Sequence, residues 1–375
     1  MELRCQHAAI MTIQHAKIET AQATRFHQAY DILRQAISDK AFPGCAFGLL
    51  VDGKVVLADA LGHFTYEPHS PQVAADTLFD VASITKVAST TAAAMLLHQR
   101  GLLHLDTRVG DLLPGFVIGR DPAQQARHVT IRHLLAHTSG LPGYVPLYAT
   151  ATTPYALLRA CLELPLTALP GERAEYSDHG FILLGKALET ITREYLATWV
   201  KREVFAPLGM TASRYCPPHL LRTSIPPTEE DELFRQRRIQ GEVQDEHAYL
   251  LKGAGGHAGL FSNVPDLLRF AQALLQPGSD KLFHPDTIEL FATRQPPHGS
   301  SHALGWDTPS ENSSAGDHFS SSSIGHLGYS GCSLWIDRQA SLAIVLLTNR
   351  TWPNRESQLI RAVRPAFHNA IRRAL

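Results

Sequence analysis

Hydrophobic and polar positions follow one another in blocks that predict strands near both ends of the chain. Residues 45–51 and 54–60 are two largely apolar runs, and Asp52-Gly53 between them is a strong signal for a hairpin turn. Two further strand-like runs lie much later, at 333–336 and 341–348. We therefore expect the two ends of the chain to pair in one sheet.

Helical spacing dominates the rest of the chain. Residues 21–40 carry an apolar face with steps of four, three and four, made of Phe26, Tyr30, Leu33 and Ile37. A helix rich in small residues is predicted from Ser83 to about residue 99. An Arg-rich helix over 356–373 closes the chain, and we interpret its arginines as a solvated face. Other helical segments lie near 130–137, 155–162, 180–200 and 264–275.

This order of elements predicts an α+β fold, in which one antiparallel sheet is flanked by the N- and C-terminal helices and carries a large, mostly helical insertion. We expect residues 1–82 and 300–375 to form the sheet domain and residues 83–299 the helical domain. An active site would lie at the seam between them. The Gly-, Ser- and His-rich segment 296–323 is longer than most loops of compact domains, so we expect it to shape specificity.

The composition is that of a globular protein and argues against several partners. The 375 residues carry 34 basic and 35 acidic side chains, a net charge of −1, which leaves no electrostatic footprint for nucleic acid or an anionic membrane. No uncharged apolar run approaches the roughly 18 residues of a membrane span, and residues 1–22 contain no apolar signal-peptide core. The 5 cysteines are scattered, without a CxxC pair. We therefore expect a soluble, cytoplasmic protein.

Three short motifs carry candidate chemistry. Ser83-Ile84-Thr85-Lys86 would place a hydroxyl and an amine on one face of a first helical turn, where the lysine could take or relay the serine proton. A capping serine followed by an exposed lysine would look the same, so this motif alone is weak. The other two motifs are Tyr176-Ser177-Asp178, after a Pro-Gly turn, and His326-Leu327-Gly328, at the start of a C-terminal strand.

Taken together, Ser83-x-x-Lys86, Tyr176-x-Asp178 and His326-x-Gly328 resemble the three motifs of serine β-lactamase-related hydrolases, in the same order and similarly spread. This family includes class C β-lactamases, D-Ala-D-Ala carboxypeptidases and esterases of the same fold. The resemblance covers about residues 43–350. Further matching stretches are RHLLAHTSGL at 132–141, GHAGLFS at 256–262, and GHLGYSG followed by SLWID between 325 and 337.

The resemblance implies a role for each motif residue. Ser83 would be the acylated nucleophile, with Lys86 and Tyr176 sharing the general base and acid work. The backbone amides of Ser83 and Tyr329 would form the oxyanion hole. Substrate contacts are expected from Asp178, His326, Leu327, Gly328 and His257. No cofactor is implied.

Several positions depart from the penicillin-recognising members of that family. A Thr in place of Leu327 would bond to a substrate carboxylate, and losing a bond worth about 1.5–3 kcal/mol weakens binding roughly ten- to a hundredfold. His326 replaces a permanent lysine cation, for which a protonated imidazole could substitute. Asp178 replaces Asn, and near Lys86 it would keep the amine charged. We therefore hypothesise that Tyr176, stabilised as a phenolate by Lys86, is the main base.

Two groups of histidines raise the question of a metal site. His133 and His137 are four residues apart on a predicted helix, but no carboxylate stands where a metalloprotease needs one, so we expect structural hydrogen bonding. In the second group, a metal would require the side chains to converge. That group consists of Asp245, Glu246, His247 and His257. The glycines at 253–256 suggest a mobile loop over a pocket, so for this group we expect contact with substrate in preference to a metal, with a plain surface loop as the open alternative. We predict no metal at either place.

The sequence therefore predicts a serine hydrolase that forms an acyl-enzyme on Ser83 and takes small-molecule esters, amides or lactams. The preferred reading is an esterase for small esters or amides. The alternative is a D-amino-acid peptidase, a carboxypeptidase or a weak β-lactamase acting on muropeptide-like compounds. A binding protein that keeps the fold without turnover is the rival from another class, and the intact set of Ser83, Lys86 and Tyr176 argues against it. The sequence leaves the oligomeric state open.

Overall fold

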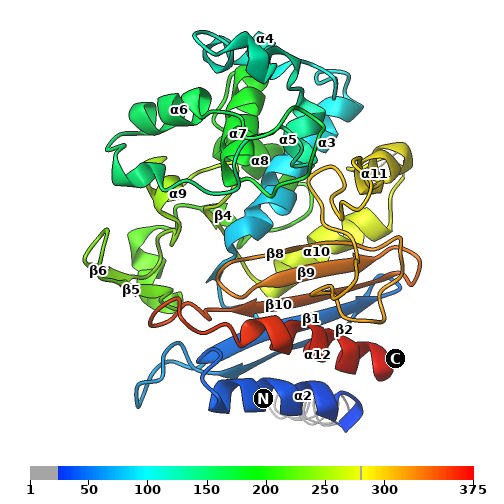
Figure 1. The fold of residues 1–375 in the computed structure, drawn as a ribbon. Coiled ribbons are helices and arrows are strands. Elements are labelled where there is room, and N and C mark those ends of the chain that lie inside the picture. Colours follow the sequence, from blue (N-terminus) through cyan, green and yellow to red (C-terminus); the bar gives the residue numbers. More distant parts are fainter. Residues whose placement is uncertain (1–23, 279–280) are drawn as a thin grey trace, which may run out of the picture.

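The computed structural model describes residues 24–278 and 281–375, and a five-stranded antiparallel sheet built from both ends of the chain lies at its base (Figure 1). The strands lie in the order β2-β1-β10-β9-β8, and Cys45 pairs with Thr348 where the two ends meet. Their bounds are Gly44–Val51 (β1), Lys54–Gly62 (β2), Ile324–Leu327 (β8), Ser333–Asp337 (β9) and Leu342–Thr348 (β10). The predicted α+β class is confirmed.

The first helix and hairpin form close to where the sequence predicts them. Helix α2 (His27–Ser38) buries Tyr30 and Leu33, whereas Ile37 is only partly buried. The expected start of this helix at residues 21–23 lies outside the described residues. At the β1–β2 turn, Asp52 and Gly53 both have positive φ, 48° and 73°, as a two-residue hairpin turn of the favoured type requires.

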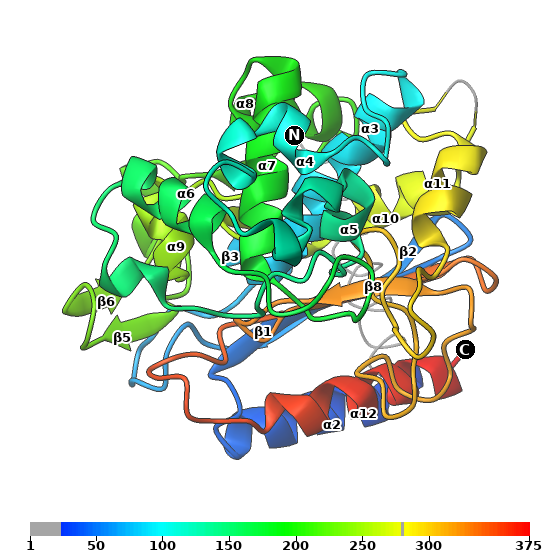
Figure 2. The same ribbon diagram turned by 45° about the horizontal axis from the view of Figure 1, so that its top comes forward.

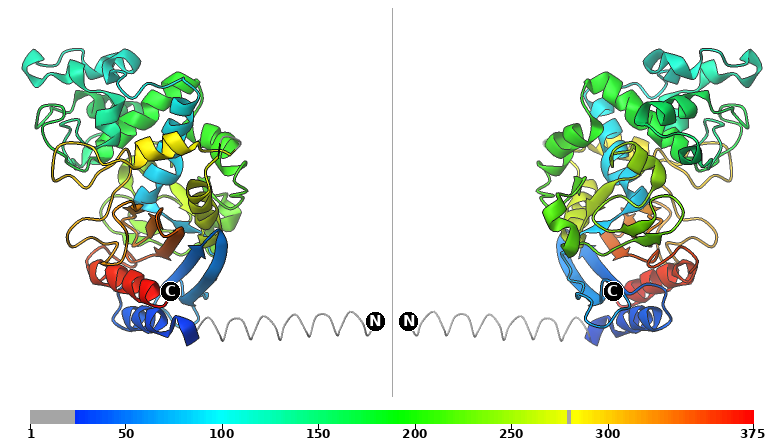
Figure 3. Two further views of the ribbon diagram at one scale, coloured as in Figure 1. Left: turned by 90° about the vertical axis from the view of Figure 1, so that its right-hand side faces the viewer. Right: turned by 90° about the vertical axis from the view of Figure 1, so that its left-hand side faces the viewer.

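Helices cover both faces of the sheet (Figure 3). Helices α2 and α12 (Ile360–Arg373) pack side by side on one face, and α10 (Val264–Leu275) packs on the other. Strand β10 is apolar from Leu342 to Leu347, as expected for a strand with both faces buried. Its residues Leu342, Ile344 and Leu346 join the core under α2 and α12. Its residues Ala343, Val345 and Leu347 join the core on the side of α10.

The helical part of the chain lies over the sheet, and two of its predicted helices are interrupted (Figure 2). The helix expected from Ser83 to residue 99 begins as a 3₁₀ turn, Ala82–Ile84, continues as a π-helical turn, Lys86–Thr91, and becomes α3 only at Ala92–Gln99. The segment 180–200 divides into α7 (Asp178–Thr192) and α8 (Leu196–Val200). The break follows from Arg193, whose φ of 57° cannot continue a right-handed helix.

The remaining elements are short. The helices are α4 (Val109–Leu112), α5 (Ile131–Leu135), α6 (Pro154–Glu163), α9 (Glu246–Leu250) and α11 (Pro285–Ala292). The strands are β3 (Phe79–Asp80), β4 (Arg214–Tyr215) and β7 (Leu260–Ser262), which pair in one small sheet, and the hairpin of β5 (Glu229–Asp231) and β6 (Arg237–Ile239). Within the described ranges, no helix is long and apolar enough to cross a membrane. The division into two domains stays a prediction.

Candidate active site

Ser83 lies at the start of a helix that comes directly off a strained turn. The preceding residue, Ala82, has φ of 47°, a left-handed conformation that costs energy for any residue with a Cβ. The buried Asp80 carboxylate holds this turn by accepting the Ala82 amide at 2.9 Å and the Gln244 amide at 2.8 Å. Burial raises the pKa of Asp80 to about 6, although both amides oppose it. The strain at Ala82 is therefore offset by the hydrogen bonds of the Asp80 carboxylate, just before Ser83.

Lys86 lies one helical step further and is completely buried. Its Nζ atom donates to Ser83 Oγ at 2.9 Å, to Asp178 Oδ1 at 2.6 Å and to the His257 carbonyl at 3.2 Å. An ammonium group has three hydrogens, so all of them have acceptors. Burial lowers the pKa of Lys86, but Asp178 and Tyr176 outweigh it, so the pKa lies above its ordinary value. At neutral pH the amine is charged.

The side chain of Tyr176 packs against Lys86 from the loop before α7. Its ring centre lies 4.8 Å from Lys86 Nζ and 4.7 Å from the ring centre of His137. His137 Nδ1 accepts the backbone amide of Ser177 at 3.0 Å and so fixes this loop. Burial raises the pKa of the Tyr176 phenol and outweighs the charge of Lys86, which lowers it. The resting phenol is therefore neutral.

Asp178 is the first residue of α7, and this position at the helix N-terminus stabilises its negative charge. Ser177 caps the helix by accepting the Gly180 amide at 3.3 Å, and a carboxylate in the first turn is favoured by the helix dipole. Burial alone would raise the pKa of Asp178, but Lys86 and His257 hold it below its usual value. Lys86 and Asp178 therefore form an ion pair beside Ser83.

Strand β8 carries the third motif to the helix start. A Cβ at Gly328 would come within 2.4 Å of the Val81 carbonyl, so only glycine allows the strand end to approach Ser83 this closely. Burial and then Lys86 lower the pKa of His326 to about 3. The imidazole, whose Nδ1 lies 2.7 Å from the Leu327 carbonyl, is thus neutral at neutral pH. The expectation that a protonated His326 substitutes for a lysine cation is therefore wrong.

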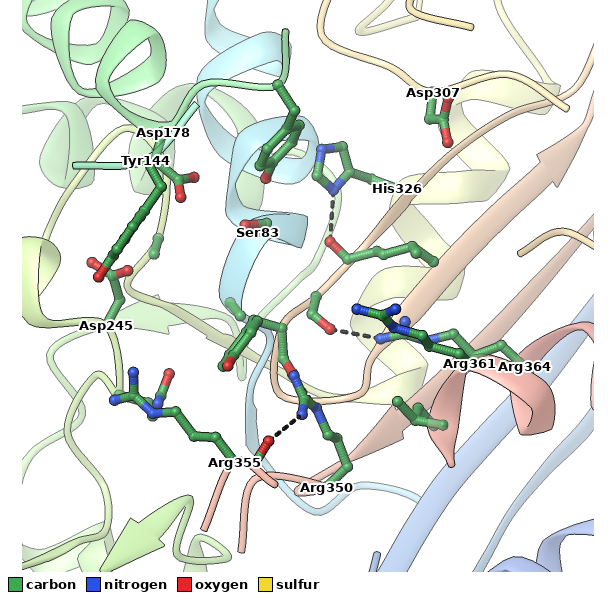
Figure 4. A pocket seen from close by; sticks show the side chains of 18 of the residues that line it. Ser83, Tyr144, Asp178, Asp245, Asp307, His326, Arg350, Arg355, Arg361 and Arg364 are labelled. Atoms are coloured by element: carbon green, nitrogen blue, oxygen red, sulfur yellow. Dashed lines mark hydrogen bonds between the residues drawn. The ribbon is translucent and has the colours of Figure 1, made fainter. Parts of the chain in front are cut away.

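Four of these residues, Ser83, Tyr176, Asp178 and His326, line one wall of a cavity of about 630 Å³, whereas Lys86 is buried and does not line it. Figure 4 shows Ser83 in the middle, with Tyr144, Asp178 and Asp245 on one side and Arg350, Arg361 and Arg364 on the other. Leu327, Gly328 and Tyr329 also line the cavity. Segment 296–323 contributes His302 and Asp307. Charges of both signs therefore line the cavity around Ser83, because Asp307 lies on the side of Arg361 and Arg355 lies on the side of Asp245.

His257 lies elsewhere than we expected. Its side chain is 1% exposed and does not line the cavity, so the expected contact with substrate is replaced by two internal bonds. Its Nε2 lies 2.7 Å from Asp245 Oδ1, and its carbonyl accepts from Lys86. The backbone carbonyl of His257 therefore stabilises the Lys86 ammonium of the ion pair, and the His257 imidazole lowers the pKa of Asp178.

The two histidine groups have different outcomes. His133 Nδ1 accepts the Thr130 amide at 3.1 Å in a capping box, and His137 binds the loop before α7, so both make the structural hydrogen bonds that the sequence predicts. In the second group, Asp245, His247 and His257 do converge, with one candidate ligand atom from each within 4.8 Å of the others. Asp245 Oδ1 is already shared between His257 and the amide of Ala248 at 2.7 Å.

The sequence did not point to the basic wall of the cavity. Arg364 is 6% exposed, so the interpretation of the C-terminal arginines as a solvated face is wrong for this residue. A signal was present, because Arg364 falls on the same helical stripe as the buried Ile360, Phe367 and Ile371. Arg350 and Arg355 lie on the chain between β10 and α12, where no periodicity predicts burial.

Comparison with known proteins finds relatives along most of the chain. A family model described as Beta-lactamase matches residues 29–366. The N-acetylmuramyl-L-alanine amidase of Bacillus subtilis (strain 168) is 30% identical and aligns with 88% of this chain and 83% of its own length. An Escherichia coli (strain K12) protein named "Putative D-alanyl-D-alanine carboxypeptidase" is 30% identical over 73% of this chain and 69% of its own.

A solved structure extends the likeness to the fold. EstCE1, a hydrolase with promiscuous acyltransferase activity, superposes with a TM-score of 0.71 at 23% identity, covering 92% of this chain and 100% of that one. The family model spans most of the chain, and the sequence relatives align along most of it. The chain therefore belongs to the β-lactamase family and is a serine hydrolase of that fold.

Proposed function

We propose that this protein hydrolyses small esters and amides through an acyl-enzyme on Ser83. The observation that carries the proposal is the buried Lys86 ammonium, which binds Ser83 Oγ at 2.9 Å and Asp178 Oδ1 at 2.6 Å at the wall of an open cavity. A capping serine with a structural role would not need a buried cation beside it. A nucleophile needs its proton transferred to a neighbour within hydrogen-bond reach, and this arrangement supplies one.

In the proposed reaction, Ser83 Oγ attacks the substrate carbonyl and its proton passes into the Lys86–Tyr176 pair. The amides of Ser83 and Tyr329 bind the resulting oxyanion. The C–O or C–N bond to the leaving group then breaks, and the leaving group takes the proton from Tyr176. Water attacks the acyl-enzyme by the reverse route and releases the acid.

Tyr176 remains our choice as the main base. Its pKa is raised at rest and so is that of Lys86, which means that the pair must lose one proton before Ser83 can be deprotonated. The nearby ammonium stabilises a phenolate, whereas Asp178 stabilises the ammonium. The phenol is therefore the better site for that loss.

A second candidate is an amide hydrolase for muropeptide-type substrates. Two sequence relatives carry names of that kind, an amidase and a carboxypeptidase. The exposed Arg361 guanidinium lines the cavity and has no side-chain partner among the described residues, so it is free to meet a substrate carboxylate. Leu327 offers no hydroxyl for that carboxylate, which favours recognition on the arginine side over recognition at the third motif. The cytoplasmic location predicted from the sequence would suit recycled muropeptides.

The experiment that separates these readings compares wild type with Ser83→Ala on three substrates. They are a short-chain chromogenic ester, a chromogenic cephalosporin and an N-acetylmuramyl-L-alanine amide. Ester turnover that Ser83→Ala loses supports the first candidate. Preferential turnover of the N-acetylmuramyl-L-alanine amide supports the second. Preferential cephalosporin turnover would make the protein a β-lactamase. No turnover, together with no labelling by a fluorophosphonate, would overturn the proposal in favour of a binding protein.

A further inference from the structure

Arg364 is a buried cation whose bonds all go to one loop. It lies on the apolar stripe of α12 and is 6% exposed. Its Nη2 donates to the Gly328 carbonyl at 2.7 Å and to the Cys332 carbonyl at 3.0 Å, and its Nε donates to the Gly331 carbonyl at 3.2 Å. The guanidinium thus binds the loop that joins β8 to β9, on the wall of the cavity that Arg364 itself lines (Figure 4).

The Gly328 carbonyl accepts from Arg364 and from the Gly331 amide at 3.0 Å, and these two bonds fix the direction of the next amide. A peptide unit is planar and trans, so the carbonyl of Gly328 and the amide of Tyr329 point in opposite directions. With the carbonyl held against Arg364, the Tyr329 N–H must face away from Arg364. Among the described residues, that N–H has no hydrogen-bond partner. It is therefore free to donate to a ligand.

The peptide unit after Tyr329 is held in a similar way. Arg350 Nε donates to the Tyr329 carbonyl at 2.7 Å, and its guanidinium lies 4.3 Å from the centre of the Tyr329 ring. In both peptide units that flank Tyr329, the carbonyl oxygen therefore accepts a hydrogen bond from an arginine. The next residue of the loop is fixed separately, because the Ser330 hydroxyl donates to the Asp80 carbonyl at 2.8 Å and the Arg350 amide donates to the Ser330 carbonyl at 2.8 Å. Tyr329 itself is 49% exposed.

The charge of Arg364 also lacks a counter-charge. Within residues 24–278 and 281–375, no carboxylate forms an ion pair with it, and all its recorded acceptors are neutral carbonyls. Burial lowers the pKa of Arg364 to about 10, so it stays charged at neutral pH. A buried cation without a counter-ion is costly. A transition-state oxyanion on the Tyr329 amide would supply the missing negative charge.

We propose that Arg364 is a positioning residue that aims and polarises the Tyr329 amide toward the oxyanion, with Arg350 bracing the next peptide unit. The inference rests on the proposed acyl-enzyme function of the same site. A cation on the carbonyl oxygen draws electron density away from the N–H, which makes the amide a stronger donor. The effect is greatest in the transition state, because only there does the substrate oxygen carry a full negative charge.

The test uses the full chain and compares Arg364→Gln, Arg364→Lys and Arg372→Gln. Arg372 is the matched control, since it lies on the same helix, is largely buried and pairs with Asp337 away from the cavity. For each protein we would measure kcat and KM on the chromogenic ester, the inhibition constant of a phenylboronic acid and the midpoint of thermal unfolding. The boronic acid adds to the nucleophile and mimics the tetrahedral oxyanion.

In Arg364→Gln, kcat is expected to fall and the boronate inhibition constant to rise in parallel, each by about ten- to a hundredfold, below the 10²–10³-fold loss of a whole oxyanion donor. KM should change less than about twofold. Arg364→Lys should recover part of both effects because it restores the charge but not the fork of donors. Should Arg364→Gln fail to fold, Arg364→Lys carries the same comparison.

Two results would overturn the inference. One is a folded Arg364 variant with unchanged kcat and boronate affinity. The other is an equal loss of kcat in Arg372→Gln, which would trace the effect to general destabilisation. The proposed function fails differently, because wild type itself would then show no ester turnover and no boronate inhibition.

Discussion

Lys86 donates to three acceptors at once, and this saturation decides how a reaction can begin at the site. The ammonium binds Ser83, Asp178 and the His257 carbonyl, so it has no hydrogen left for the substrate. It also cannot accept the serine proton until it loses one of its own. The protonation state of the Lys86–Tyr176 pair must therefore control the acylation rate.

Replacing Asp178 by Asn should shift the pH dependence of the reaction to lower pH. The Asp178 carboxylate raises the pKa of both Lys86 and Tyr176, so removing its charge lowers both. The reactive, singly deprotonated pair then forms at lower pH, and the rising limb of kcat/KM should move down by about one to three pH units. A pH–rate profile of both proteins measures this.

The exposed carboxylate Asp106, which pairs with Arg132 and does not line the cavity, provides the control. Asp106→Asn should leave the limb where it is in wild type. If the rising limb of kcat/KM in Asp178→Asn stays at the wild-type pH or moves to higher pH, the Lys86–Tyr176 pair is not the titrating base.

Tyr176→Phe and Lys86→Ala should separate the two partners of the base. If the phenol is the main base, Tyr176→Phe loses about 10²–10⁴-fold in acylation rate, the usual contribution of general base catalysis. Lys86→Ala should slow acylation as well and raise the pH at which the rate is half-maximal, because the charge that lowers the pKa of Tyr176 is gone. Pre-steady-state acylation measurements give both values. A Lys86→Ala variant that alone loses acylation would reverse the roles.

At the level of elements, local sequence patterns predicted the helices, strands and turns that depend mainly on residues close together in the sequence. The hairpin at Asp52-Gly53, the strand pair β9–β10 and helix α10 all appear where periodicity and turn residues place them. The helix at Ser83 was predicted as one piece because the positive φ of Ala82 is not readable from the motif alone. The nearby Asp80 carboxylate binds the Ala82 amide, but it is itself held by the amide of Gln244, which is distant in sequence. The three motifs identified the segments that carry Ser83, Tyr176 and His326, but none of them pointed to α12. The buried Arg364 of α12 binds backbone carbonyls of the β8–β9 loop, and no local pattern predicts that contact.

Gly328→Ala should damage the junction between β8 and the helix start. The new Cβ would come within 2.4 Å of the Val81 carbonyl, which is backbone and cannot rotate away. Overpacking of this kind costs about 1–3 kcal/mol in the free energy of unfolding, and the displaced strand should also lower kcat. Urea unfolding and ester turnover measure the two effects.

Gly180→Ala is a suitable control because a Cβ there meets nothing nearer than 3.8 Å, within helix α7. It should leave turnover unchanged and preserve or raise stability, since alanine favours helices. Normal stability and turnover in Gly328→Ala would mean that the close approach of strand and helix is not needed for the site.

At the scale of the whole molecule, the fold depends on pairing residues that lie about 300 positions apart. Strand β1 pairs with β10, and α2 packs on α12, so the sheet that carries β8 exists only when both ends of the chain have joined. The strand-like runs at both ends of the chain, with helices between them, were enough to predict this pairing. The course of segment 296–323 was not predictable, because it contains little regular structure and follows its contacts with the cavity wall.

Phe47→Ala should therefore destabilise the whole molecule. Phe47 is fully buried on β1 and touches Tyr30 of α2 and Phe367 of α12, with ring centres 5.3 and 5.7 Å away. Truncating such a residue costs about 3–5 kcal/mol. Chemical unfolding measures the loss, and Val55→Ala, at a side chain 57% exposed on β2, should cost far less. Equal losses in the two variants would contradict a core shared by the chain ends.

The most direct test of the central claim is the mass of the adduct that a fluorophosphonate ester leaves on the intact protein, followed by peptide mapping. One adduct per chain is expected, on the peptide that contains Ser83, and Ser83→Ala should carry none. Modification of wild type should follow the same pH dependence as ester turnover. An adduct at any other residue, or an ester turnover that persists in Ser83→Ala, would contradict the account.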